Sequence, residues 1–234
     1  DRMDYLKRDS FYSGVSEGNV NSERIIQMMN VVDDVLVIEE KGIYSVEKFL
    51  MSRRLMYWQV YLHKTSLVAE SILTKILKRA KELTLKGEEL TASSPLSFFM
   101  HNKVTMETFD ADTLNLFSKL DDFDIISALK SWQDHPDFIL SSLSKMIINR
   151  DLLKIKLSSE KVTSEELLPL KERFVLENGI TLAEANYFIF RGKIKNQAYS
   201  KEAEPIRILK KDKTIEDIVD ASDQLNFKSV SKFV

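Results

Sequence analysis

The sequence predicts a mainly α-helical protein that is followed by a smaller α+β C-terminal part. Residues 46–85 contain neither glycine nor proline, which is typical of a long helical stretch. Three shorter stretches, at about 110–118, 121–133 and 136–149, also show helical patterns. After residue 150 the pattern becomes mixed, with a strand-like run at 205–209. Together these observations place the chain in the α class, with strands mostly near its C-terminus.

The long stretch 46–85 exceeds the usual length of a helix in a globular protein, so we expect two helices or one bent helix. Ser45 is a suitable residue to cap its start. Before it, residues 31–44 place β-branched residues around the turn Glu-Glu-Lys-Gly at 39–42, which predicts a small hairpin or a single strand. Further on, Thr163–Glu166 and Thr181–Glu184 each have the spacing of a capping box.

The composition excludes several classes of protein. The chain has 234 residues, 44% of them hydrophobic, with a formal net charge of -2 and no cysteine. Without cysteine it has no disulfide framework, no zinc finger and no thiol nucleophile. The lack of a basic excess argues against a nucleic-acid partner and a membrane-surface role. With no apolar run long enough to span a bilayer, we expect a cytoplasmic protein.

Two helical faces carry polar side chains that are able to support chemistry. At the N-terminus, Asp1, Tyr5, Arg8 and Asp9 share one face, because residues four and seven to eight apart align on a helix. This face combines carboxylates, a phenol and a guanidinium. An exposed, salt-bridged surface explains the same pattern, so composition alone does not assign a function to this face.

The second face lies within the long helical stretch. One stripe along this helix carries Arg53, Tyr57, Tyr61 and Lys64, and His63 lies near the edge of the stripe. The cations suit phosphate oxygens, and the phenols suit an aromatic base or a sugar. The alternative is an amphipathic helix with half-buried tyrosines.

Other polar residues fit structural roles better. His101 and His135 are far apart in sequence and near expected loops, where we interpret them as surface or capping residues. The acidic residues at 121, 122 and 124 suit the first turn of a helix, where the helix dipole favours negative charge. We find no phosphate-binding P-loop, no Gly-x-Ser-x-Gly motif and no His-Glu-x-x-His motif.

The two polar faces together resemble HD-domain metal-dependent nucleotide triphosphohydrolases, both bacterial enzymes and vertebrate SAM-and-HD-domain enzymes. The run DRMDYLKRD at 1–9, with the Gly14-Val15 loop, is similar to the last metal-binding helix of that family. The later Arg53…Tyr57…Tyr61-x-His63-Lys64 is similar to a second family motif. The resemblance implies an incomplete HD helical bundle at 1–86, a helical extension at 87–158 and an α+β region at 159–234.

The resemblance also implies a metal site. The family uses His, His-Asp and a final Asp, and this final residue corresponds to Asp1. Carboxylate and imidazole ligands suit a divalent or trivalent ion such as Mn, Mg, Fe, Ni or Zn. The three histidines of this chain match no HD motif. We therefore expect the other ligands to lie upstream, and we expect residues 1–234 alone to be inactive.

The same resemblance assigns substrate contacts by position. Arg2, Arg53 and Lys64 match residues that contact phosphate, whereas Tyr5 and Asp9 match residues at the sugar. Tyr61 matches a tyrosine beside the sugar, and His63 a residue near the sugar or phosphate. Tyr57 stands where a relative has histidine. The predicted substrate contacts are therefore Arg2, Tyr5, Asp9, Arg53, Tyr57, Tyr61, His63 and Lys64. The predicted metal ligand is Asp1. The resemblance also implies a homodimer or higher oligomer.

The implied activity is hydrolysis of a (deoxy)nucleoside triphosphate to a nucleoside and triphosphate. One alternative keeps HD phosphohydrolase chemistry but changes the substrate to a nucleoside monophosphate, an alarmone or another phosphate ester. The other is a non-catalytic regulatory protein that binds a nucleotide. Product analysis separates the two enzymatic readings, and intact His and His-Asp motifs upstream would argue against the regulatory one.

Overall fold

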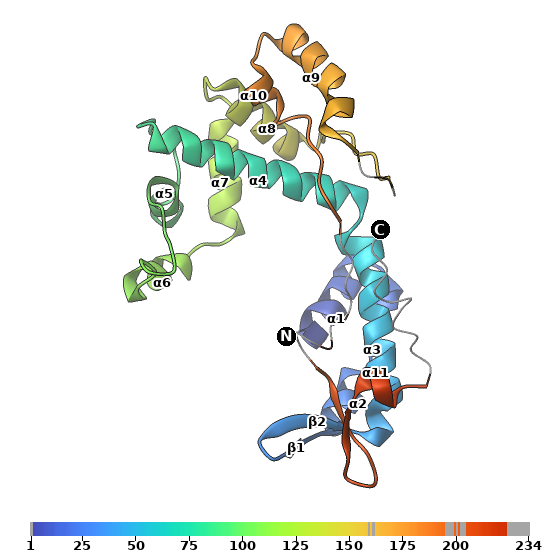
Figure 1. Cartoon of the computed structure of the whole chain (residues 1–234). Helices are drawn as coiled ribbons and strands as arrows, with labels where there is room; N and C mark the ends of the chain where they lie inside the picture. Colours follow the sequence, from blue (N-terminus) through green and yellow to red (C-terminus); the bar gives the residue numbers. More distant parts are fainter. Residues whose placement is uncertain are drawn as a thin grey trace. The chain divides into compact units, whose positions relative to one another are not determined.

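The computed structural model describes residues 2–158, 160, 162–194, 199, 201 and 205–223. The chain forms two compact units. The first unit comprises residues 1–66 and 192–234, and the second comprises residues 67–191. Figure 1 shows that both are built mainly from helices. The predicted fold class, mainly α with a small β component, is confirmed.

The first unit combines short helices with one small sheet. Its helices are α1 (Arg2–Ser13), α2 (Ser22–Gln27), α3 (Ile43–Met56) and α11 (Ile218–Ala221), with the 3₁₀ turns η1 (Ser16–Gly18) and η2 (Glu40–Gly42) and the π-helix η3 (Tyr57–Tyr61). Its strands are β1 (Met29–Val32), β2 (Val35–Glu39), β3 (Arg207–Leu209) and β4 (Ile215–Asp217). Residues from α1, α3, β3 and α11 share one core, which includes the fully buried Leu6, Leu50, Met56, Ile208 and Ile218.

The hairpin of residues 29–39 forms as predicted, but its turn is different. The chain reverses at Asp33 and Asp34, which have φ angles of 51° and 58°. Aspartate tolerates this left-handed region better than most residues. The segment Glu40–Gly42, which was predicted as the turn, is instead the 3₁₀ turn that leads into α3. Gly42 is needed there because a Cβ atom would lie 2.7 Å from Ile38 Cγ2.

The sheet has the strand order β1-β2-β3-β4. β1 and β2 are antiparallel, β3 and β4 are antiparallel, and β3 lies parallel to β2 with Ile208 opposite Ile38. The C-terminal strands therefore complete a sheet begun near the N-terminus. The compact units consequently divide the chain differently from the predicted ranges 1–86, 87–158 and 159–234, because residues 205–218 pair with residue 38 and its neighbours.

The long helical stretch is interrupted, in agreement with the prediction of two helices or a bend. α3 ends at Met56, the π-helix η3 follows, and α4 runs from Lys64 to Leu85. The interruption contains neither glycine nor proline. It is made instead by a wider hydrogen-bonded turn, in which the backbone N–H of Leu62 donates to the carbonyl of Tyr57 at 2.6 Å.

The second unit contains α4 from residue 67 on and six further helices in its described residues. These are α5 (Ser94–His101), α6 (Ala111–Phe117), α7 (Asp122–Trp132), α8 (Phe138–Asn149), α9 (Ser164–Asn178) and α10 (Leu182–Ala185). Most begin at capping residues that the sequence marks, including Asp121 and Thr181, whose capping boxes are complete. Residues 152–157 alternate between apolar and charged side chains, a pattern typical of a strand, but they form none.

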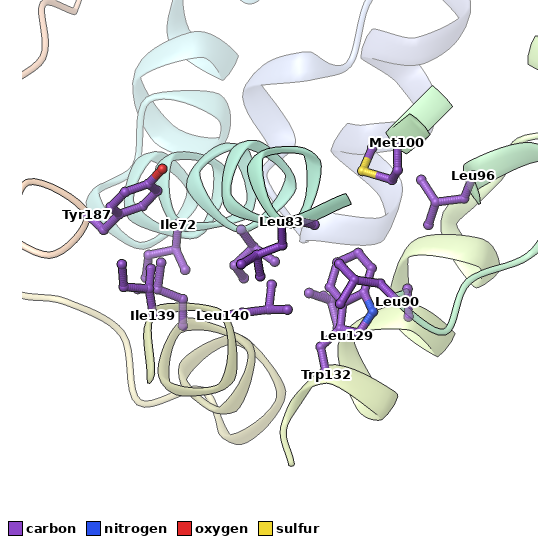
Figure 2. Packing of buried hydrophobic residues seen from close by; sticks show 14 of the residues in the cluster. Ile72, Leu83, Leu90, Leu96, Met100, Leu129, Trp132, Ile139, Leu140 and Tyr187 are labelled. Carbon is purple, nitrogen blue, oxygen red and sulfur yellow. The ribbon is translucent and has the colours of Figure 1, made fainter. Parts of the chain in front are cut away.

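The core of the second unit lies between α4, α7 and α8 (Figure 2). Ile72, Leu140 and Trp132 are almost fully buried there. The indole N–H of Trp132 donates to the carbonyl of Thr91 at 3.0 Å, so its one polar atom is satisfied. Among the described helices, none is both long and apolar enough to cross a membrane.

Candidate functional site

Five of the predicted site residues lie together in the first unit. Tyr5 and Asp9 come from α1, Arg53 comes from the last turn of α3, and Tyr57 and Tyr61 come from η3. We refer to these five residues as the tyrosine cluster. Their side chains are half-buried. The two polar faces recognised in the sequence thus meet in the folded unit.

A hydrogen bond joins the two faces. The hydroxyl of Tyr61 donates to Oδ2 of Asp9 at 2.5 Å, across 52 positions of sequence. The rings of Tyr5 and Tyr61 meet edge to face, with centroids 6.2 Å apart. The rings of Tyr57 and Tyr61 do the same at 5.0 Å. These contacts fix Tyr61 between two other phenols and direct its hydroxyl to the carboxylate.

The cation of the cluster lies against an aromatic ring. Cζ of Arg53 lies 5.5 Å from the centroid of the Tyr57 ring. Burial raises the pKa of Tyr5, and neighbouring Tyr57 raises it further, while Arg53 acts in the opposite direction. Burial and the hydrogen bond to Asp9 also raise the pKa of Tyr61. Both phenols therefore stay protonated near neutral pH and remain able to donate hydrogen bonds.

The π-helix accounts for this arrangement. In a regular α-helix, Tyr57 and Tyr61 would follow each other at a fixed angle and the helix would continue past residue 61. The hydrogen bond between Leu62 N and Tyr57 O spans five residues, which widens this turn. Short π-helical turns within α-helices occur frequently at functional sites. Here the wider turn carries two of the three tyrosines of the cluster.

Contacts around η1 hold α1 beside α3, and the sequence analysis missed them. A Cβ atom on Gly18 would lie 2.6 Å from Ser10 Cβ and 2.9 Å from Met56 Sδ, so only glycine allows this approach. Gln59 Nε2 donates to Glu17 Oε1 at 2.9 Å, and this bond lowers the pKa of Glu17. A glycine before a helix is a common pattern, so nothing in the sequence marked this one as a packing point.

The remaining predicted residues flank the cluster along the chain. Arg2 is half-buried at the start of α1. His63 and Lys64 are exposed beyond η3, and Nδ1 of His63 accepts from the backbone N–H of Thr65 at 3.3 Å. Arg8 forms a salt bridge with Asp4 at 3.1 Å on the exposed side of α1. For Arg8, the alternative of an exposed, salt-bridged surface therefore applies.

The predicted metal ligand, Asp1, lies outside the described residues. Among the residues that are described, no three or more histidine, cysteine, aspartate or glutamate side chains gather as a metal site would require. The described residues therefore do not by themselves fit the metal ion that the resemblance implies.

A separate cavity of about 320 Å³ lies in the same unit. Lys7 of α1, Lys48 of α3 and the residues from 19 to 23 line it. None of the predicted site residues lines this cavity. The tyrosine cluster is therefore identified as a candidate site by its polar and aromatic contacts, and not by a cavity.

Comparisons with known proteins agree with the resemblance at a coarse level. Residues 20–99 match the family described as the HD associated region. A solved phosphohydrolase from Bacteroides thetaiotaomicron has the same fold with a TM-score of 0.86 and 50% identity, over all of this chain and 58% of that one. The chain is related to HD phosphohydrolases.

Two further relatives extend this picture. The uncharacterised Bacillus subtilis protein YwfO is 44% identical over 156 residues, which cover 66% of this chain and 34% of that protein. A Dictyostelium discoideum protein named as a SAMHD1 homolog, a deoxynucleoside triphosphate triphosphohydrolase, is 28% identical over 90 residues, or 38% of this chain and 17% of that protein. The chain thus spans about a third of the length of the Bacillus protein.

Proposed function

We propose that this chain forms part of a metal-dependent HD phosphohydrolase that converts deoxynucleoside triphosphates to nucleosides and triphosphate. The observation that carries the proposal is the hydrogen bond from Tyr61 to Asp9, with Arg53 beside the same ring system. A nucleotide presents a sugar hydroxyl, an aromatic base and several phosphate oxygens. The cluster offers an acceptor, aromatic faces and a cation for these three parts.

Each residue has a distinct part in this proposal. Asp9 uses Oδ2 for Tyr61 and offers Oδ1 to a sugar hydroxyl. The phenol of Tyr5 is protonated near neutral pH, as tyrosine ordinarily is, so its hydroxyl is a donor for the same sugar. Tyr57 packs beside the sugar or base. The guanidinium of Arg53 binds phosphate, because its N–H groups match the spacing of phosphate oxygens.

Residues at the edge of the cluster complete the proposed substrate site. Lys64 and Arg2 add positive charge for the rest of the triphosphate, and His63 lies near the sugar or phosphate. The proposed metal, held by Asp1 and by ligands outside residues 1–234, would polarise the phosphoryl group and lower the pKa of a bound water. We therefore expect residues 1–234 to be inactive alone. Assembly into a dimer or higher oligomer also remains a proposal.

Product analysis tests the proposal directly. The complete protein is incubated with mixed deoxynucleoside triphosphates and Mn²⁺ or Mg²⁺, and the products are separated. Release of deoxynucleoside and triphosphate is the expected result. Release of phosphate or pyrophosphate instead of triphosphate would contradict the proposed reaction. Absence of turnover with metal bound would favour another phosphate ester as the substrate or a non-catalytic regulatory role.

The phosphate assignment has its own test. Replacing Arg53 by alanine in the complete protein should weaken nucleotide binding by about tenfold or more, because a charge-assisted hydrogen bond is lost. Arg54→Ala is the matched control, since Arg54 is on the same turn of α3 but points about 100° away. Equal nucleotide affinity in Arg53→Ala and the unaltered protein would refute the assignment.

A further inference from the structure

Three lysines of the second unit lie close enough to repel one another, and two of them bind the same asparagine. Lys75 and Lys78 lie on α4, and Lys171 lies on α9. Nζ of Lys75 donates to the backbone carbonyl of Asn186 at 2.8 Å, and Nζ of Lys171 donates to Oδ1 of the same residue at 2.6 Å. Two ammonium groups that are 96 positions apart in the chain are thereby held at a single residue, Asn186, next to α10.

These positive charges repel one another. The pKa of Lys75 is lowered, first by burial and then by the charges of Lys78 and Lys171. No carboxylate acts on Lys75 to offset this effect. Within the part of the chain that the structure describes, none of the three lysines forms a salt bridge. The arrangement therefore concentrates positive charge without a counter-ion from the described residues.

Aromatic rings hold Lys75 in place. Its Nζ lies 4.1 Å from the centroid of the Phe190 ring and 5.5 Å from that of Tyr187. Tyr187 itself lies at the end of the core near Ile72 (Figure 2), and its hydroxyl donates to Glu82 at 2.6 Å. The nearby acid is thus engaged with Tyr187. The rings stabilise the cation but supply no formal negative charge.

The lysines keep donors for a further partner. A protonated lysine has three N–H donors. Asn186 takes one donor from Lys75 and one from Lys171, and Lys78 is exposed on the next turn of α4. A tetrahedral oxyanion has several acceptor oxygens and the negative charge that these groups lack.

We propose that Lys75, Lys78 and Lys171 form a binding site for a small phosphate-class anion, supplied by inorganic phosphate, inorganic triphosphate or the phosphates of a nucleotide. The site lies in the second unit and shares no residue with the tyrosine cluster. The proposal is therefore independent of the proposed function, and either can fail without the other.

Calorimetric titration with inorganic phosphate and with inorganic triphosphate tests the site. Because the proposed substrate site would also bind triphosphate, we expect saturable binding of one triphosphate per chain in the Arg53→Ala background. Phosphate should bind more weakly because it carries less charge. Lys78→Gln and Lys171→Gln should each weaken triphosphate binding by about tenfold, because each removes a charge-assisted hydrogen bond. Lys130→Gln, an exposed lysine on α7 of the same unit, is the control and should leave the affinity unchanged.

A second readout separates binding from folding. Without any anion, Lys78→Gln should have a melting temperature at or above that of the unaltered chain, because removing one charge relieves the repulsion. With triphosphate present, the unaltered chain should gain more thermal stability than Lys78→Gln does. Lys75→Gln is a less suitable variant, because Lys75 is partly buried and its loss also removes the contact with Phe190.

Three results would overturn the proposal. One is binding that does not saturate, and another is an equal loss of affinity in Lys130→Gln, which would indicate general surface charge. The third is binding of a single-stranded oligonucleotide that depends on Lys78 and Lys171 while triphosphate does not bind. A comparison of deoxynucleoside triphosphate with inorganic triphosphate, both titrated into Arg53→Ala, shows which of the two the lysine site prefers. Tighter binding of the nucleotide would mean that its nucleoside part also contacts the site.

Discussion

Arg79 of the second unit and Arg53 of the tyrosine cluster have different surroundings. Nε and Nη2 of Arg79 donate to the two carboxylate oxygens of Asp137, at 3.1 and 2.5 Å. Tyr187 then donates to Glu82, which lies 3.5 Å from Arg79. In the first unit, Arg53 lies against the ring of Tyr57, and its side chain also interacts with Tyr5.

The two regions contain the same types of side chain but differ in how far their polar atoms are already used. The side chains of Arg79 and Asp137 are only 13% and 14% exposed, and Asp137 also caps α8 by accepting from Leu140 N at 2.9 Å. That network is closed, and it joins α4 to α8. Asp9 is half-buried and gives one oxygen to Tyr61. A closed network stabilises the fold, whereas an open one is able to bind a ligand.

The largest expected effect tests the closed network. Arg79→Met should reduce the free energy of unfolding by about 3 kcal/mol, because it leaves the buried carboxylate of Asp137 without its cation. Urea unfolding measures this. Arg173→Met is the control, since its salt bridge to Glu177 is exposed and should contribute little to stability. Similar losses in the two variants would contradict the comparison.

The next effect concerns the support of the open cluster. Gly18→Ala should reduce the free energy of unfolding by about 1–3 kcal/mol, because the new Cβ would overlap Ser10 and Met56. Gly192→Ala introduces a Cβ with no atom within 4 Å and should be nearly neutral. Circular dichroism during thermal unfolding compares the variants. A stable Gly18→Ala chain would show that α1 is not held in place by this approach.

Two matched tyrosine variants distinguish the roles of the regions. Tyr187→Phe should lower the stability of the chain by about 1 kcal/mol, because it removes the hydrogen bond from the Tyr187 hydroxyl to Glu82. Tyr61→Phe should cost no more stability but should weaken nucleotide binding by the complete protein. Chemical denaturation and nucleotide titration provide the two readouts. Equal nucleotide affinity in Tyr61→Phe and Tyr187→Phe would remove the functional distinction.

The smallest effect is a dependence on pH. Burial would raise the pKa of Asp137, but hydrogen bonds from Arg79 and Leu140, with the charge of Arg79, outweigh it and hold the pKa below the usual value of an aspartate. A carboxyl with a lowered folded pKa contributes stability above its unfolded pKa, and that contribution is lost as the pH falls through the folded pKa. The unaltered chain should therefore lose more stability below about pH 4 than Asp137→Asn does. Denaturant titrations between pH 2 and 6 follow this, and parallel curves would exclude it.

The sequence predicted much of the local structure because its signals act over a few residues. The capping box at Thr181–Glu184 forms as its spacing indicates. Gly179 ends α9 with a φ angle of 64°, a conformation that glycine adopts readily. The helical stripe also grouped Arg53, Tyr57 and Tyr61 correctly, although it assumed a regular helix. The alternating residues 152–157 form no strand, because alternation alone supplies no partner strand.

The amino-acid sequence by itself determined where most helices begin and end, and which polar side chains share a helical face, because these properties depend on neighbours within about two turns. Only the tertiary structure brought Tyr61 to Asp9, placed β3 beside β2 and gathered Lys75 and Lys171 at Asn186. Each of these contacts joins residues that are far apart in the chain. They depend on which surfaces bury each other when the chain packs, and no local spacing encodes that choice.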